Sequence, residues 1–328
     1  MLKKTILILE CSRIFSLPMS ILSWMVIFTY SVIDSGNIPY GILSLIGICF
    51  AHLGTNLLDD FFDYKSLIKQ VDFNKTEYLK NSQKTKCRYL ISGLMKEQHI
   101  FYLASIYFLI ATLIGLFLFI KCGMGVIQFA IAGGIIAMLY PFLSKICLSE
   151  LAVALAYGPI LFGGVYYVMC GTFCTEVFIL SIPTMIMTVI LLYVHTVMDY
   201  EYDLAENKLT IANRFNSQLD SLIILKILLV LAYASVFLLC VFDILDWQVF
   251  LSYLTIPMAF DLYNSLEKFS CDESSIPTKK WYHFPMENMK TFQKKGEDAF
   301  MIRMFQSRNL MIYFSIFIVI AIILSLAI

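Results

Sequence analysis

Two clusters of acidic residues end two long apolar stretches of this sequence. Residues 56–63 read NLLDDFFD and residues 199–203 read DYEYD; they are called the first and second acidic motifs below. A carboxylate at the edge of a bilayer is costly unless a cation offsets its charge. Magnesium fits best, because it prefers hard oxygen ligands and often bridges a few carboxylates to substrate phosphates. The motifs therefore predict a cation site.

Helical spacing aligns the first acidic motif along one side of a helix. Asn56, Asp60 and Asp63 stand at i, i+4 and i+7 and share a face. Asp59 is turned about a quarter circle away from that face. The three aligned residues therefore face the same side.

The second acidic motif extends the same pattern with a histidine. His195, Asp199 and Asp203 stand at i, i+4 and i+8. Like charges stacked in this way destabilise a helix by a few tenths of a kcal/mol per pair in water, so cations are needed to offset them. The alternative interpretation is that these acids cap loops and are merely solvated.

Composition places the chain in a membrane. Of its 328 residues 59% are hydrophobic and 15% are charged, and the mean hydropathy is +0.78; soluble domains have about 25% charged residues. The formal net charge is zero, which argues against a nucleic-acid partner. The nine cysteines show no spacing typical of zinc or haem sites and are interpreted as packing residues.

Nine apolar stretches approach the length of about 20 residues that a helix needs to cross a bilayer. We therefore expect an all-α integral membrane protein with nine transmembrane helices and one domain over residues 1–328. The expected spans are 14–33, 39–58, 99–120, 123–143, 151–170, 174–198, 219–242, 247–264 and 308–328.

The distribution of basic residues predicts the orientation of these spans. With the N-terminus in the cytoplasm, 22 of the 24 Lys and Arg fall in cytoplasmic segments, mostly in two polar loops, 64–98 and 265–307. Lys121 lies on the opposite face and Lys226 inside a span. This asymmetry follows the positive-inside rule. It puts both acidic motifs on the cytoplasmic side and the C-terminus on the other side, in a protein expected in a bacterial cell membrane.

Together with further motifs, the two acidic motifs make the chain resemble the UbiA superfamily of membrane prenyltransferases. Within it, the chain is most similar to the branch of the 1,4-dihydroxy-2-naphthoate prenyltransferases of menaquinone synthesis. The resemblance rests on the acidic motifs and on residues 12–18 (SRIFSLP), 88–93 (RYLISG), 140–143 (YPFL), 157–159 (YGP) and 207–212 (NKLTIA).

This resemblance implies a UbiA-type bundle whose central cavity opens to the cytoplasm and to lipid. It also implies transfer of a polyprenyl group from a polyprenyl diphosphate to an aromatic acceptor with two magnesium ions. Asn56, Asp60 and Asp63 would hold one ion, and Asp199 and Asp203 the other.

Further site residues follow from the chemistry that the resemblance implies. The leaving diphosphate would be neutralised by basic residues, and aromatic faces would stabilise the allylic cation. His195 is the candidate base for the proton released by the acceptor; a packing role is the alternative. The basic candidates are Lys208, Arg88, Lys145 and Arg13, and the aromatic candidates are Tyr140, Tyr157 and Tyr166.

Departures from the family pattern leave the acceptor open. Asp59 stands where Asn is common, and His195, Met198 and Asn207 replace residues that are commonly Asn, Arg and Gly. Other acceptors of the superfamily are 4-hydroxybenzoate, homogentisate, tetrapyrroles and glyceryl phosphate lipids. An ion-coupled transporter is the alternative outside it; the acids lie at the bilayer edge, whereas transporters usually place them near the midplane.

Overall fold

The computed structural model describes residues 2–69, 75, 87–205 and 209–325. This part of the chain is helical, and in it eight helical stretches are long and apolar enough to cross a membrane. They are built by α2 (Pro18–Ile33), α3 (Ile38–Leu67), α6 (Glu97–Cys122), α7 (Met124–Leu143), α8 (Ser149–Leu155) continued by η2 (Ala156–Ile160) and α9 (Leu161–Cys170), α10 (Glu176–Met198), α12 (Gln218–Val241) and α15 (Asp298–Ser325). An all-α integral membrane protein is confirmed.

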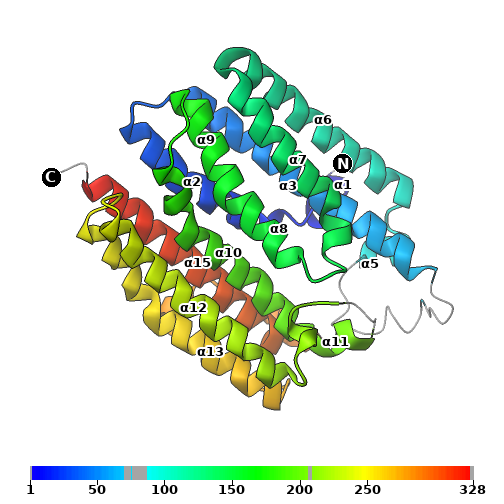
Figure 1. Cartoon of the computed structure of the whole chain (residues 1–328). Helices are drawn as coiled ribbons and strands as arrows, with labels where there is room; N and C mark the ends of the chain where they lie inside the picture. The colour runs from blue at the N-terminus through cyan, green and yellow to red at the C-terminus, as the bar shows by residue number, and fades with distance from the viewer. Residues whose placement is uncertain (1, 70–74, 76–86, 206–208, 326–328) are drawn as a thin grey trace.

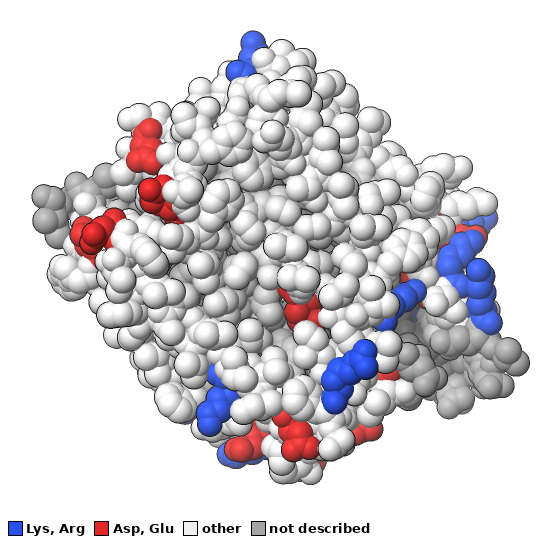
Figure 2. Space-filling view, in the orientation of Figure 1, with Lys and Arg blue, Asp and Glu red and all other residues white. Residues whose placement is uncertain are grey.

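The helices lie side by side in one bundle (Figure 1). At one edge α3 packs on α6 and α7, and at the other α10 packs on α12 and α15. The core is largest around α10, of which 61% of the apolar window is buried, against 11% in α6 and α7. In Figure 2 the side chains over the helices are mostly uncharged, as expected of a surface in contact with lipid.

Four short helices mark one end of the bundle. α1 (Leu2–Cys11) and η1 (Ile14–Ser16) precede α2, and α5 (Arg88–Ile91) precedes α6. α11 (Tyr200–Ala205) follows α10. The ends of α3 and α10 point toward α5 and α11 (Figure 1), so both acidic motifs come to this end, which we call the acidic end.

The expected span 247–264 has a different structure. It consists of a 3₁₀ helix, η4 (Trp247–Thr255), followed by α13 (Ile256–Cys271), and neither piece is by itself long enough to be a candidate span. Pro257 explains the change, because its missing N–H cannot bond the Tyr253 carbonyl as an α-helix requires. The Ile256 N–H bonds that carbonyl instead. A count of nine spans is therefore not confirmed for the described residues.

The last helix begins earlier than expected. α15 starts at Asp298, whereas the sequence predicted a span from 308 and a loop over 265–307. Within that range α13 continues to Cys271, and η5 (Trp281–His283) and α14 (Met289–Lys295) follow. Residues 276–297, called the strap below, therefore lie between α13 and α15 and carry structure of their own. In the other predicted loop, 64–98, α3 continues to Leu67 and α6 begins at Glu97.

Polar contacts attach the strap to both neighbouring helices. Asp261 of α13 accepts hydrogen bonds from Lys280 Nζ and Tyr282 Oη, each 2.7 Å long, and lies 3.0 Å from His283 Nε2. From α15, Asn309 and Tyr313 donate to backbone carbonyl oxygens of residues 285 and 284. The strap is thus held at a fixed place against the bundle.

Candidate active site

A cavity of about 1980 Å³ opens between the two halves of the bundle. Both acidic motifs line it, the first from α3 and the second from the end of α10 and from α11. Its deeper wall is apolar and follows α7 from Tyr140 to Val126. Since the helix rises 1.5 Å per residue, this wall is about 21 Å long. Carboxylates therefore stand above an apolar slot.

Arg13 is the cationic partner of the first acidic motif. Its Nη2 donates to Asp60 Oδ1, and its Nη1 lies 3.8 Å from Asp59 Oδ2. Asp59 and Asp60 are nearly fully buried, at 3% and 2% exposure. Asp59, expected to be turned away from the shared face, also lines the cavity.

The backbone of Arg13 is adapted to this contact. Between α1 and η1 it adopts the left-handed conformation, with φ of 55°, which is uncommon for residues other than glycine and carries strain. Burial disfavours the charged guanidinium, but Asp60 and Asp59 outweigh burial and raise the pKa of Arg13 above its ordinary value. Arg13 therefore remains positively charged beside the motif.

Tyr89 is a site residue that the sequence did not single out. Its hydroxyl donates to Asp60 Oδ2 at 2.8 Å. Burial and the neighbouring Asp60 raise the pKa of Tyr89, so its hydroxyl stays protonated and donates. Tyr89 belongs to the stretch 88–93, from which only Arg88 had been selected for its charge; Arg88 lines the cavity too.

Asn56 is oriented by two hydrogen bonds. Its Nδ2 donates to the Ser12 carbonyl at 3.2 Å and to Ser16 Oγ at 3.0 Å. Because the carbonyl can only accept, the nitrogen of the amide is identified. Neither bond engages Oδ1, the atom through which Asn56 would bind a metal.

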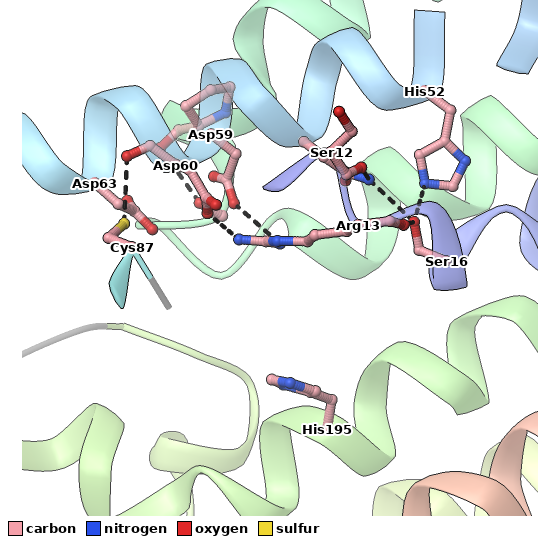
Figure 3. A network of polar contacts seen from close by, with 12 residues as sticks. Ser12, Arg13, Ser16, His52, Asp59, Asp60, Asp63, Cys87 and His195 are labelled. Atoms are coloured by element: carbon pink, nitrogen blue, oxygen red, sulfur yellow. Dashed lines mark hydrogen bonds and ion pairs between the residues drawn. The ribbon is translucent and has the colours of Figure 1, made fainter. Parts of the chain in front are cut away.

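The second acidic motif lies across the cavity from the first. His195 Nδ1 is 3.0 Å from Asp199 Oδ2, so the expected i, i+4 contact is present. α10 ends at Met198, but the Asp203 N–H bonds the Asp199 carbonyl at 2.8 Å and carries the helical path into α11. Asp203 is 2% exposed. Figure 3 shows His195 on the opposite wall from Arg13 and the first motif.

The basic candidates differ in whether the structure places them at the cavity. Lys145 Nζ lies 3.5 Å from Asp63 Oδ1 and lines the cavity. Lys208 lies outside the described residues. Lys295 of the strap and Arg308 of α15 also line the cavity, although no sequence pattern distinguishes them from other basic residues of their segment.

The three aromatic candidates separate in space. Tyr140 and Tyr157 line the cavity, whereas Tyr166 is not among its lining residues. The Tyr166 hydroxyl donates to Asp34 at 3.0 Å, at the end of the bundle opposite the acidic end. Tyr140 and Tyr157 therefore remain candidates for stabilising the allylic cation, and Tyr166 does not.

A neutral polar cluster lies deeper in the same cavity. His52, one turn before Asn56, contacts Ser16 Oγ through Nε2 at 3.0 Å. Its Nδ1 faces Ser20 Oγ at 2.6 Å and Tyr157 Oη at 3.0 Å. All four residues line the cavity.

The donor atoms at the acidic end fit magnesium bound together with a phosphate. In the part of the chain that the structure describes, no three His, Cys, Asp or Glu residues form a metal site by themselves. Magnesium commonly takes one or two protein carboxylates and completes its shell with water and substrate phosphates. Two sets of carboxylates facing one cavity suit that mode of binding.

The geometry agrees with a match to known sequences. The profile of the UbiA prenyltransferase family matches residues 17–286. The chain belongs to the UbiA prenyltransferase family. It is an enzyme that transfers prenyl groups, and it is a multi-pass integral membrane protein. No curated protein sequence matches the chain.

Solved structures of UbiA homologues share the fold at low sequence identity. A homologue from Aeropyrum pernix K1 superimposes with a TM-score of 0.59 at 13% identity, covering 92% of this chain and 97% of that one. A homologue from Archaeoglobus fulgidus, bound to GPP and Mg²⁺, gives 0.55 at 12%, covering 92% and 99%. A structure described as digeranylgeranylglyceryl phosphate synthase gives 0.54 at 16%, covering 97% and 99%.

Proposed function

We propose that this UbiA-family enzyme uses magnesium to transfer a polyprenyl group from an allylic diphosphate to 1,4-dihydroxy-2-naphthoate, a step of menaquinone synthesis. The observation that supports prenyl transfer is the single cavity in which two acidic motifs stand above an apolar wall about 21 Å long. A polyprenyl diphosphate has the matching shape, with a polyanionic head and a hydrocarbon tail.

The residues at the acidic end would bind the diphosphate in two ways, through metal ions and through basic side chains. Asn56, Asp60 and Asp63 would hold one magnesium ion and Asp199 and Asp203 a second. Bound there, the metal would neutralise charge that develops on the leaving oxygens. Arg13 and Lys145 already lie beside the first motif and add positive charge for the leaving diphosphate.

The reaction breaks the bond between the allylic carbon and oxygen, and the electron pair leaves with the diphosphate. The ring of Tyr140, which lines the cavity, would stabilise the allylic cation without attacking it. The acceptor carbon then forms the new bond. With the naphthoate, the ring carboxylate leaves as carbon dioxide and its electron pair restores the aromatic ring, so no ring proton is released. With an acceptor that loses a proton when the new bond forms, His195 is the candidate base for that proton.

A second acceptor class is favoured by one comparison. Digeranylgeranylglyceryl phosphate synthase shares the fold over 97% of this chain, so a glyceryl phosphate lipid is the alternative acceptor. The naphthoate is preferred because the spacing of the first motif and the stretch 157–159 resemble that branch of the family.

The test is product formation by the purified protein in detergent. It is incubated with magnesium, geranylgeranyl diphosphate and, in parallel, 1,4-dihydroxy-2-naphthoate, 4-hydroxybenzoate and geranylgeranylglyceryl phosphate, and products are identified by mass. We expect a prenylated, decarboxylated naphthoate, and loss of the product with EDTA. A product with only one of the other acceptors would replace the proposed acceptor and keep prenyl transfer.

Substitutions test the metal assignment in the same assay. Asp60→Ala and Asp199→Ala should each lower turnover by at least about 100-fold, because each removes a carboxylate that stabilises the departing diphosphate through the metal. Asp243→Asn, at an exposed acid outside the cavity, is the matched control and should keep full turnover. Retained turnover in either alanine variant would contradict the assignment.

A further inference from the structure

The neutral cluster of Ser16, Ser20, His52 and Tyr157 is not explained by binding of a diphosphate. His52 precedes Asp60 by two helical turns and so lies about 12 Å deeper along α3. At that depth the remaining cavity wall is mostly apolar. A few convergent polar groups in an apolar pocket usually fix the orientation of a ligand.

Hydrogen-bond accounting fixes the proton of His52. Ser16 donates its hydroxyl hydrogen to the Arg13 carbonyl at 2.8 Å, and its oxygen accepts from Asn56 Nδ2 at 3.0 Å. Ser16 can therefore only accept from His52, so Nε2 of the imidazole carries the hydrogen. Nδ1 is then the acceptor, with a single lone pair.

Two hydroxyl groups approach that one lone pair. Ser20 Oγ is the nearer, at 2.6 Å, and Tyr157 Oη lies at 3.0 Å. Whichever of the two hydroxyls donates to Nδ1, the Tyr157 oxygen keeps its own accepting lone pairs. The Tyr157 oxygen can therefore accept one further hydrogen bond.

The backbone at Tyr157 supports a functional role. Tyr157 lies in the π-helical turn η2, and π turns occur frequently at functional sites. The next residue, Gly158, has non-helical backbone angles, and a Cβ there would lie 2.7 Å from Met185 Sδ. The close packing on α10 requires glycine, and the wider turn sets Tyr157 against His52 of α3.

We propose that this cluster binds a hydroxyl group of the prenyl acceptor, which donates its hydrogen to the Tyr157 oxygen. Ser20 and His52 are positioning residues that orient the Tyr157 hydroxyl. The inference rests on the proposed prenyl transfer, and it applies to a naphthol, a phenol or a glyceryl lipid, since each has a free hydroxyl group. It places the acceptor hydroxyl deeper in the cavity than the proposed diphosphate site.

The experiment measures KM for each substrate in wild type, Tyr157→Phe and His52→Leu. The probe is whichever of the three acceptors named above the wild type prenylates. We expect the KM for the acceptor to rise about tenfold in both variants, as loss of one hydrogen bond predicts. The KM for geranylgeranyl diphosphate should stay within about twofold. His52→Gln, which retains an acceptor and a donor, should recover part of the loss.

A blocked acceptor provides the sharper readout. With an aromatic acceptor, which is prenylated at a ring carbon, wild type should prefer the free hydroxyl over its methyl ether by about tenfold, and Tyr157→Phe, which keeps the aromatic ring, should lose that preference. With a glyceryl lipid the free hydroxyl is itself the nucleophile, so the KM comparison decides in that case. Tyr233→Phe is the matched control, because its hydroxyl bonds Thr255 outside the cavity. Thermal protection by magnesium and geranylgeranyl diphosphate confirms that each variant is folded.

The possible failures are distinct. If Tyr157→Phe keeps both the acceptor KM and the preference for the free hydroxyl, the cluster is only an interhelical contact and the inference is wrong, while prenyl transfer stands. Should wild type prenylate none of the three acceptors, the proposed function fails and this inference fails with it. If His52→Leu does not fold, Tyr157→Phe decides alone.

Discussion

At the scale of single residues, Arg13 determines the electrostatics of the first acidic motif. Two nearly buried carboxylates, Asp59 and Asp60, approach one guanidinium, whose two nitrogens reach one carboxylate each. A buried pair of like charges would otherwise be strongly unfavourable. The left-handed backbone of Arg13 is the local cost of this arrangement.

We predict that Arg13→Lys lowers activity although it keeps the charge. A lysine ammonium is a single point charge and cannot reproduce the planar fork that reaches both carboxylates. The KM for geranylgeranyl diphosphate should rise by about tenfold, in line with the loss of one charge-assisted hydrogen bond. Steady-state kinetics measure this change, and an unchanged KM would show that Arg13 is only a structural counter-ion.

The sequence predicted the residues of this site better than their contacts. The spacing of Asn56, Asp60 and Asp63 is a helical property and is visible without a structure. The contact between Arg13 and Asp60 joins residues 47 positions apart. The turn that permits it has left-handed backbone at Arg13, where no glycine indicates such a conformation in the sequence. For the same reason Tyr89 and His52 were not recognised as partners, since their roles depend on which helices are neighbours.

At the scale of elements, α7 supplies the apolar wall along which the prenyl tail would lie. Its small residues Ala130, Gly134 and Ala137 line the wall below Tyr140. A Cβ at Gly134 would meet no atom within 4 Å, so this stretch borders open space. A bulky side chain placed on this stretch should therefore shorten the slot and select among prenyl chains.

We predict that Ala130→Phe discriminates against long prenyl diphosphates. The added ring would fill the slot about 15 Å below Tyr140, as the helical rise over ten residues indicates. Turnover of geranylgeranyl diphosphate should fall about tenfold, while geranyl diphosphate, which is shorter, should be nearly unaffected. Ile135→Phe, exposed on α7 but outside the cavity, is the control. Equal losses for both substrates would contradict this role.

The strap is an element whose stability should depend on pH. His283 is 1% exposed, and burial lowers its pKa below the ordinary value of 6.5 despite the opposing effect of Asp261. The unfolded or detached strap therefore binds more protons below pH 6.5, so its attachment is complete above that pH and weakens as pH falls. Lys280 and Gln306 are the other polar groups that face the imidazole.

We predict faster hydrogen exchange in residues 276–297 at pH 5.5 than at pH 7.5, after correction for the intrinsic effect of pH. Protonation of His283 would place a positive charge beside Lys280, which already bonds Asp261. Exchange measured by mass spectrometry should show α10 unchanged as an internal reference. A strap whose corrected exchange is independent of pH would mean that His283 is not linked to its attachment.

At the scale of the whole molecule, an overall neutral chain separates its charges along the bundle. In Figure 2 Lys and Arg gather mainly toward the end where α5 and α11 lie, and the middle is largely uncharged. Composition and hydrophobic length predicted this membrane architecture well. They did not predict the break of 247–264 into η4 and α13, although Pro257 is its local cause. They could not predict the early start of α15, because it depends on packing against neighbouring helices.

The orientation of the bundle leads to a labelling prediction. Cys271 is exposed at the end of α13, and the positive-inside rule places that end in the cytoplasm. In intact cells an impermeant maleimide should leave Cys271 unmodified, whereas it should label Cys174, between α9 and α10 on the opposite side. Peptide mapping after permeabilisation supplies the positive control, and Cys271→Ser confirms the peptide. The reverse labelling pattern would show that the bundle has the opposite orientation in the membrane.

The apolar wall along α7 affects how the reaction rate depends on the concentration of the prenyl substrate. The prenyl substrate reaches the slot from the surrounding lipid. The reaction rate should therefore depend on the mole fraction of prenyl substrate in the lipid. Adding inert phospholipid at constant substrate should then slow the reaction by simple dilution in two dimensions. The polar acceptor, in contrast, would respond to its aqueous concentration if it reaches the cavity from water.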